Sequence, residues 1–286
     1  MITKILYYIL VLPISLLPYK ILNLFSKVLF FIVIKFIRYR KDVVINNLKI
    51  AFPSKKCKEI NLITKNFYIH LCNILLENIK MISASKSFFN KRVSFCNPEL
   101  LNKYFDEKQT IIMVAGHFNN WEWIGQKISI SAKQKWVSIY KPINNKIIDE
   151  ILKKVRSRFG ALNVSMNESL RYILKTKNIT QIIGIIADQN PVINKTTTWI
   201  KFFNKEVPVF IGAEKIARKM GYPVIFCDIK NNGIGKYNVK FEELELNPKE
   251  TKEGYITKLY IKRLEEQIKN NPAKWLWSHR RWKHKK

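Results

Sequence analysis

Residues 111–122, Ile111 to Glu122, read IIMVAGHFNNWE and decide the interpretation of this chain. The first five residues are an uninterrupted apolar run, which is typical of a buried strand. His117 stands just after this run, and Glu122 follows five residues later. A carboxylate that holds an imidazole ring fixes its tautomer and stabilises its protonated form. We therefore expect His117 to be a general base that Glu122 orients. No serine or cysteine stands beside the pair as a nucleophile, so the pattern favours direct transfer of a group to a substrate hydroxyl.

Apolar runs and helical periodicity alternate along the chain on both sides of this stretch. Further strands are predicted at residues 137–140, 182–187, 224–228 and 237–241. Helices are predicted at residues 54–78, with Ser54 as the cap, and at 147–155, 168–175, 212–220 and 251–269. Strands that alternate with helices indicate an α/β sheet core. We expect residues 1–40 to be a membrane-associated helical segment and residues 41–286 to be a single α/β domain.

The composition points to an anionic partner. The net charge is +30, which suits nucleic acid, an anionic membrane or an acidic protein. Zinc-finger, RNP-like and basic-zipper patterns are missing from the sequence, so nucleic acid is not expected. The four cysteines are scattered without a CxxC pair, which predicts neither a zinc site nor a disulfide framework and favours a reducing compartment.

The first forty residues combine a broad apolar surface with a basic stripe. The uncharged run from Ile5 to Tyr19 has 15 residues, whereas a bilayer span needs ~20. Apolar sequence resumes directly after it, so a cleaved signal peptide is not expected. Basic residues fall close to one face of a helix and favour a position at the membrane interface: Lys20, Lys27, Lys35 and Arg38. The alternative is a helix docked on the protein's own core. The basic residues that follow place the body in the cytoplasm.

Polar clusters stand at the ends of two further predicted strands. Tyr140 and Lys141 close one strand, and Asp188 and Gln189 follow another. Function gathers at such strand ends in α/β sheets, so these side chains are candidates to face His117 across one crevice.

Two other classes of function compete with group transfer. A basic protein that only binds a membrane or nucleic acid has no need of the His117 and Glu122 pair. A metal-dependent hydrolase could use His117, Glu122 and Asp188, but no second histidine lies near this motif in the sequence. We therefore expect neither a metal nor another cofactor.

Taken together, these segments resemble the bacterial lipid A late acyltransferases, the lauroyl and myristoyl transferase family. The resemblance covers nearly the whole chain in order. The matching segments are residues 115–122 (AGHFNNWE), 140–145 (YKPINN), 156–158 (RSR), 187–191 (ADQNP), 202–203 (FF), 212–218 (GAEKIAR) and 275–283 (WLWSHRRWK). Lys141 replaces the arginine usual in the second segment, which keeps the charge but loses the planar fork.

The resemblance implies an α/β sandwich like that of glycerol-3-phosphate acyltransferases, with a mixed central sheet, at the cytoplasmic face of the cell inner membrane. It also implies transfer of an acyl chain from acyl carrier protein to a hydroxyl of a lipid A precursor. Another membrane acceptor stays open: a phospholipid, an aminolipid or a glycosylated phosphatidylinositol.

The resemblance assigns roles to individual residues. The implied catalytic set has His117 as the base, Glu122 as its orienting acid, Arg156 at the oxyanion and Asp188 as a positioning acid. The implied substrate-binding set is Tyr140, Lys141, Asn144, Arg158, Gln189, Arg280 and Arg281.

Overall fold

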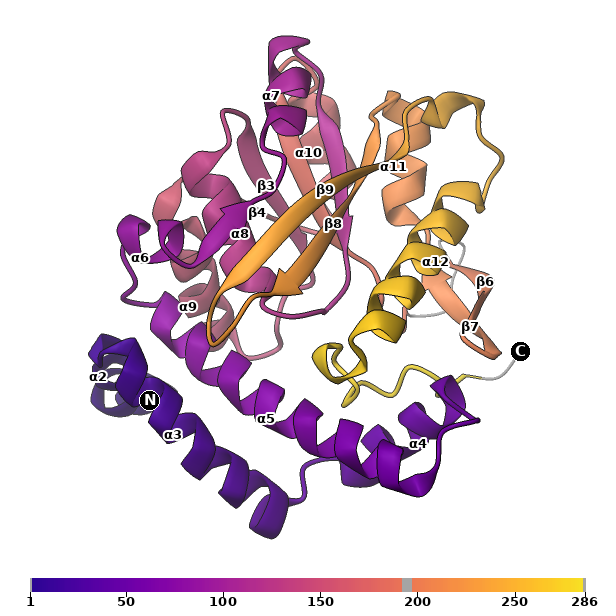
Figure 1. Cartoon of the computed structure of the whole chain (residues 1–286). Coiled ribbons are helices and arrows are strands. Elements are labelled where there is room, and N and C mark those ends of the chain that lie inside the picture. The colour runs from indigo at the N-terminus through magenta and orange to yellow at the C-terminus, as the bar shows by residue number, and fades with distance from the viewer. Residues whose placement is uncertain (1, 192–196, 285–286) are drawn as a thin grey trace.

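The computed structural model describes residues 2–191 and 197–284. A seven-stranded sheet lies at its centre, in the order β1-β9-β8-β2-β5-β3-β4, with helices packed on both faces (Figure 1). Neighbouring strands run parallel except β8 and β9, which are antiparallel. A separate antiparallel hairpin is formed by β6 and β7. The predicted α/β core with a mixed central sheet is therefore confirmed, and the sheet is mostly parallel.

The strands are β1 (Val93–Phe95), β2 (Ile111–Ala115), β3 (Lys135–Tyr140), β4 (Leu162–Ser165), β5 (Gln181–Ile186), β6 (Thr197–Phe202), β7 (Lys205–Phe210), β8 (Val224–Asn231) and β9 (Tyr237–Glu245). The α-helices are α1 (Ile2–Leu6), α2 (Leu12–Leu16), α3 (Tyr19–Ile32), α4 (Lys41–Ala51), α5 (Cys57–Met81), α6 (Lys86–Asn90), α7 (Glu99–Asp106), α8 (Trp121–Ser131), α9 (Lys146–Arg156), α10 (Ser169–Lys175), α11 (Gly212–Met220) and α12 (Tyr255–Asn270). Short π or 3-10 turns are η1 (Tyr7–Val11), η2 (Val33–Ile37), η3 (Ser157–Phe159), η4 (Pro248–Glu250) and η5 (Pro272–Lys274).

The start of α5 differs from the prediction. The helix begins at Cys57 rather than just after Ser54. Lys56 occupies the N-cap position, and its backbone N–H donates to Glu59 Oε2 at 2.9 Å. The Glu59 carboxylate therefore satisfies the helix end that the Ser54 hydroxyl was expected to satisfy.

The two faces of the sheet bury separate hydrophobic clusters. Because side chains alternate along a strand, Ile112 and Val114 of β2 face one side while Ile111 and Met113 face the other. Helices α5, α11 and α12 contribute to the first cluster, and α6, α7 and α8 to the second. Both faces of the central strands are covered, which explains why their sequences are nearly continuous apolar runs.

The N-terminal helices lie along α5, outside the sheet (Figure 1). Helix α3 buries Leu22 but leaves many large apolar side chains exposed, among them Leu24, Phe25 and Val28. None of the helices in the described residues combines the length and the apolarity needed to cross a bilayer.

Candidate active site

The register of the sheet brings His117 and Asp188 together. Ala115 at the end of β2 pairs with Ile186 at the end of the parallel strand β5. Strands β2 and β5 therefore end at the same edge of the sheet. His117 follows the end of β2 by two residues, and Asp188 follows the end of β5 by two residues. The His117 ring nitrogen Nδ1 is hydrogen-bonded to Asp188 Oδ1, and the His117 backbone N–H donates to Asp188 Oδ2 at 2.7 Å.

Asp188 is held as a buried carboxylate behind the ring. It is 1% exposed, and its Oδ2 also accepts from Trp275 Nε1 at 2.7 Å. Burial alone raises the pKa of Asp188, but the adjacent His117 ring and the hydrogen bonds from His117 and Trp275 outweigh burial and lower the pKa below its usual value. An ionised Asp188 accepts a hydrogen bond from the Nδ1–H group of the His117 ring. The Nε2 atom of the neutral ring then keeps a free electron pair. Gln189 Nε2 lies 3.2 Å from that nitrogen.

The structure corrects the predicted partner of His117. The carboxylate at its ring is Asp188, whereas both oxygens of Glu122 accept hydrogen bonds from Arg156. Arg156 Nε donates to Glu122 Oε2 at 2.9 Å, and Nη2 donates to Oε1. The reason is local, because Glu122 lies in the first turn of α8 and that turn packs beside the end of α9, where Arg156 stands.

The loop that carries His117 is pinned by the C-terminal segment and by α12. The Leu276 N–H donates to the His117 carbonyl at 3.1 Å, and Tyr260 Oη donates to the Ala115 carbonyl at 2.8 Å. A side chain at Gly116 would place its Cβ 2.4 Å from Leu264 Cδ1. Gly116 therefore allows α12 to pack directly under the histidine.

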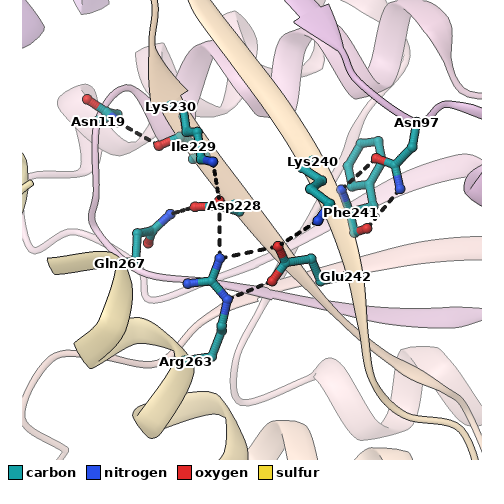
Figure 2. Close-up of polar contacts among 10 residues, drawn as sticks. All are labelled: Asn97, Asn119, Asp228, Ile229, Lys230, Lys240, Phe241, Glu242, Arg263 and Gln267. Atoms are coloured by element: carbon teal, nitrogen blue, oxygen red, sulfur yellow. Dashed lines mark hydrogen bonds and ion pairs between the residues drawn. The ribbon is translucent and has the colours of Figure 1, made fainter. Parts of the chain in front are cut away.

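A second anchor joins the turn after His117 to β8 (Figure 2). Asn119 has a φ of 53° and is 1% exposed, and its Nδ2 donates to the Ile229 carbonyl at 2.7 Å. Asp228, the preceding residue of β8, accepts from Gln267 Nε2 at 2.5 Å and pairs with Arg263 at 3.1 Å. These contacts tie the turn after His117, β8 and α12 into one polar network.

Glu77 of α5 is a functional candidate that the sequence reasoning missed. It is 2% exposed, and it accepts from Asn120 Nδ2 at 2.7 Å, from Tyr237 Oη at 2.6 Å and from Tyr19 Oη at 2.7 Å. Asn120 in turn caps α8 through the Trp123 N–H. Burial raises the pKa of Glu77, although these hydrogen bonds oppose the shift. A carboxylate within the buried stripe of a helix is the signal that could have identified it.

A cavity of about 880 Å³ opens beside the His117 ring. Six of the predicted site residues line it: His117, Glu122, Tyr140, Lys141, Arg156 and Gln189. The ring of Trp121 stands edge-on to the His117 ring at 4.8 Å between centroids and also lines this cavity. The deeper wall is apolar and comes from α8 and from strands β2, β3, β5 and β8.

Four predicted substrate-binding residues lie elsewhere. Arg281 is fully buried and donates to Asn190 Oδ1 and to the Pro208 carbonyl. It therefore stabilises the loop that follows β5, which carries Asp188 and Gln189. Burial lowers the pKa of Arg281 to about 10. Arg158 donates to the Met81 carbonyl at 2.8 Å. Asn144 and Arg280 are exposed and, like Arg158 and Arg281, are not among the residues that line the cavity. Packing inside the C-terminal segment, which a linear motif does not reveal, decides the outcome for Arg281.

Within residues 2–191 and 197–284, no three His, Cys, Asp or Glu side chains gather closely enough to hold a metal ion. Polar groups at the cavity include an imidazole backed by a carboxylate, an arginine–glutamate pair, the Gln189 amide, Tyr140, Lys141 and the N-terminus of α8.

Comparison with known proteins places this site in a family. A search of individually curated proteins finds no match to the chain. The sequence profile described as "Bacterial lipid A biosynthesis acyltransferase" matches residues 1–284, which confirms the predicted resemblance. With His117 on a carboxylate beside an apolar cavity and a match over nearly its full length, the chain belongs to the bacterial lipid A biosynthesis acyltransferase family.

Proposed function

We propose that this protein transfers a fatty acyl chain from acyl carrier protein to a hydroxyl group of a lipid A precursor, with His117 as the general base. The observation that carries the proposal is the His117 ring, which is bonded to buried Asp188 on one side and lines an apolar cavity on the other. Membership of the family supports the acyl-transfer class of reaction.

In the proposed reaction His117 Nε2 removes the proton from the acceptor hydroxyl. The oxygen attacks the thioester carbonyl, and the C–S bond of the resulting tetrahedral intermediate then breaks. The protonated ring returns its proton to the departing thiolate, so His117 ends the cycle neutral. Asp188 stabilises the positive charge that the ring carries between these two steps.

The oxyanion of the tetrahedral intermediate needs preorganised donors. The N-terminus of α8 begins at Trp121, four residues after His117, and the first N–H groups of a helix have no partners within the helix. Arg156 lines the same cavity, and Glu122 fixes the plane of its guanidinium. Both features support stabilisation of the oxyanion at this end of the cavity.

The surface around the cavity mouth suits an acidic donor protein. Lys141 is exposed and lines the cavity, and Lys146 and Lys154 are exposed on α9, the helix that follows it in the chain. A basic rim of this kind raises the association rate of an acidic partner such as acyl carrier protein.

The N-terminal helices support a position at the cytoplasmic face of the inner membrane. Large apolar side chains of residues 5–37 are exposed, and Phe36 reaches 73% exposure. Lysines are interleaved with them, which favours an interface with anionic lipid. The helices on both faces of the mostly parallel sheet are in keeping with a sandwich of the glycerol-3-phosphate acyltransferase type.

The test is acyl transfer by purified protein and its His117→Ala variant, with acyl carrier protein loaded with radiolabelled fatty acid and with purified lipid A precursor. We expect transfer by the wild type and a loss of at least 10³-fold in the variant. His284→Ala is the matched control, because His284 is not among the cavity-lining residues. Full activity of His117→Ala refutes the mechanism. Transfer to a phospholipid, but not to the lipid A precursor, refutes the assignment of the lipid A precursor as the acceptor.

A further inference from the structure

The cavity beside His117 runs between α8 and one face of the sheet. Side chains two residues apart on a strand share a face, so Trp136 and Ser138 of β3 point to the same side. Ser138 pairs with Gly184 of β5, and Gly184 pairs with Met113 of β2. Trp136, Ser138, Gly184 and Met113 all line the cavity. Near the middle of the cavity, the wall formed by the sheet thus has two small residues, Ser138 and Gly184, beside the larger Met113 and Trp136.

The Trp136 indole bridges the gap between the sheet and the helix. An ideal Cβ at Gly184 would lie 2.0 Å from Trp136 Cη2, so the ring occupies the space that a side chain there would fill. On the opposite side, an ideal Cβ at Gly125 of α8 would lie 3.4 Å from Trp136 Nε1. Two glycines thus make room for one indole, which stands across the channel from β5 to α8.

The orientation of the sheet places this barrier at the far end from His117. Trp136 pairs with Ile182, at the beginning of β5, whereas Asp188 follows the end of the same strand. The indole extends along the sheet from Ile182 to Gly184, and Gly184 pairs with Met113 of β2. Met113 and His117 are four residues apart, and an extended chain of four residues spans at most ~14 Å and about twelve single bonds.

We propose that Trp136 is the floor of the acyl-chain channel and limits the transferred chain to about twelve carbons, counted from a thioester carbonyl at His117. The inference rests on the proposed acyltransferase function and adds its chain-length specificity. An acyl chain is built from single bonds like those of the backbone, so the length of β2 between reactive group and barrier measures the chain directly. Longer chains meet the rigid indole, which β5 and α8 hold on both sides.

The test compares the specificity constants of acyl donors that differ by two carbons, from well below to well above this limit. Trp136→Ala opens about one residue length of strand, ~3.3 Å, or about three methylenes. Burial of each methylene raises binding about fourfold. We therefore expect the ratio of the specificity constant of the donor two carbons above the limit to that of the donor at the limit to rise roughly 16-fold. Ser138→Leu fills the channel on the His117 side of the indole and should shift the preference toward shorter chains.

Trp199→Ala is the matched control, because Trp199 lies in β6 and is not among the cavity-lining residues. The ratio between two donors is insensitive to the fraction of folded enzyme, so a merely structural role of Trp136 would lower all rates together. An unchanged length profile in both Trp136→Ala and Ser138→Leu overturns the channel assignment. If the wild type transfers no donor of any length, the proposed function fails instead, and the two failures are distinct.

Discussion

Replacement of Asp188 by asparagine is the sharpest test of how the His117 ring is controlled. Asp188 Oδ2 accepts from the His117 and Trp275 N–H groups, and Oδ1 accepts from the His117 ring. An asparagine that keeps the first two contacts places its carbonyl at Oδ2 and its NH₂ group at Oδ1. That NH₂ group donates to Nδ1, which forces the ring proton onto Nε2. The nitrogen that faces the cavity then has no free electron pair to accept the substrate proton.

The expected loss of activity is large, and the expected loss of stability is small. A base locked in the wrong tautomer loses roughly 10⁴-fold in kcat, as in the Ser-His-Asp triad, which corresponds to about 5.5 kcal/mol in the activation barrier. Two of the three hydrogen bonds persist and the third reverses its direction, so the free energy of unfolding should fall by only about 1–3 kcal/mol. Single-turnover acyl transfer measures the first quantity and urea unfolding the second.

Two companion variants give this experiment its controls. Asp228→Asn changes an aspartate of β8 that is buried to a similar degree, 3% against 1%, and should keep activity within about tenfold of the wild type. Glu122→Gln leaves the His117 tautomer intact and should lose far less than Asp188→Asn. Retention of at least a tenth of wild-type activity by Asp188→Asn refutes the reasoning. A deeper loss in Glu122→Gln than in Asp188→Asn returns the orienting role to Glu122.

Three further predictions address the oxyanion, the pH dependence and the membrane. Arg156→Lys keeps the charge but loses the bidentate contact with Glu122, so kcat should fall by roughly 10²–10³ in steady-state assays; a loss below threefold contradicts this role. Burial lowers the pKa of His279 from 6.5 to about 4. The unfolded chain therefore binds the extra proton first, and the urea midpoint should decline as pH falls from about 6.5 to 4, less steeply in His279→Gln; parallel profiles contradict it. The pair Phe25→Asp and Phe36→Asp places charge on exposed apolar positions and should weaken co-sedimentation with anionic vesicles at least tenfold; unchanged co-sedimentation excludes this face.

Much of the sheet could be predicted from the sequence because its central strands are buried on both faces. Burial of both faces selects continuous apolar runs, and the strand predicted at 111–115 matches β2 residue for residue. The hairpin β6–β7 escaped prediction because its strands, TTWIKF and KEVPVF, are neither continuous apolar runs nor strictly alternating, and Pro208 interrupts the second strand. Short strands such as β1, with three residues, carry too little pattern to identify.

The predicted site residues lie together wherever strand ends place them, and their contacts differ from the expected ones wherever a helix turn or packing places them. Strand ends brought His117, Asp188 and Gln189 together as expected. Spacing in the sequence could not identify the carboxylate that bonds His117. Glu122 is only five residues away in the chain, and Asp188 follows the strand beside β2 in the sheet. Only the direction of the first turn of α8 decides between them. Arg281 shows the same limit, since a linear basic motif does not reveal that its guanidinium is buried over Phe202.

In the proposed mechanism the two carboxylates beside the cavity have separate roles, because their surroundings differ. Asp188 is buried and accepts hydrogen bonds from the His117 backbone N–H, from Trp275 Nε1 and from the His117 ring. It therefore holds one proton on Nδ1. Glu122 lines the cavity and accepts from Arg156 with both oxygens, which fixes the plane of the guanidinium. A base needs a fixed tautomer, whereas an oxyanion donor needs a fixed plane, and one carboxylate cannot supply both from a single position. In the proposed mechanism the fold supplies the two carboxylates from different elements: Asp188 follows the end of β5, and Glu122 in the first turn of α8 meets Arg156 at the end of α9.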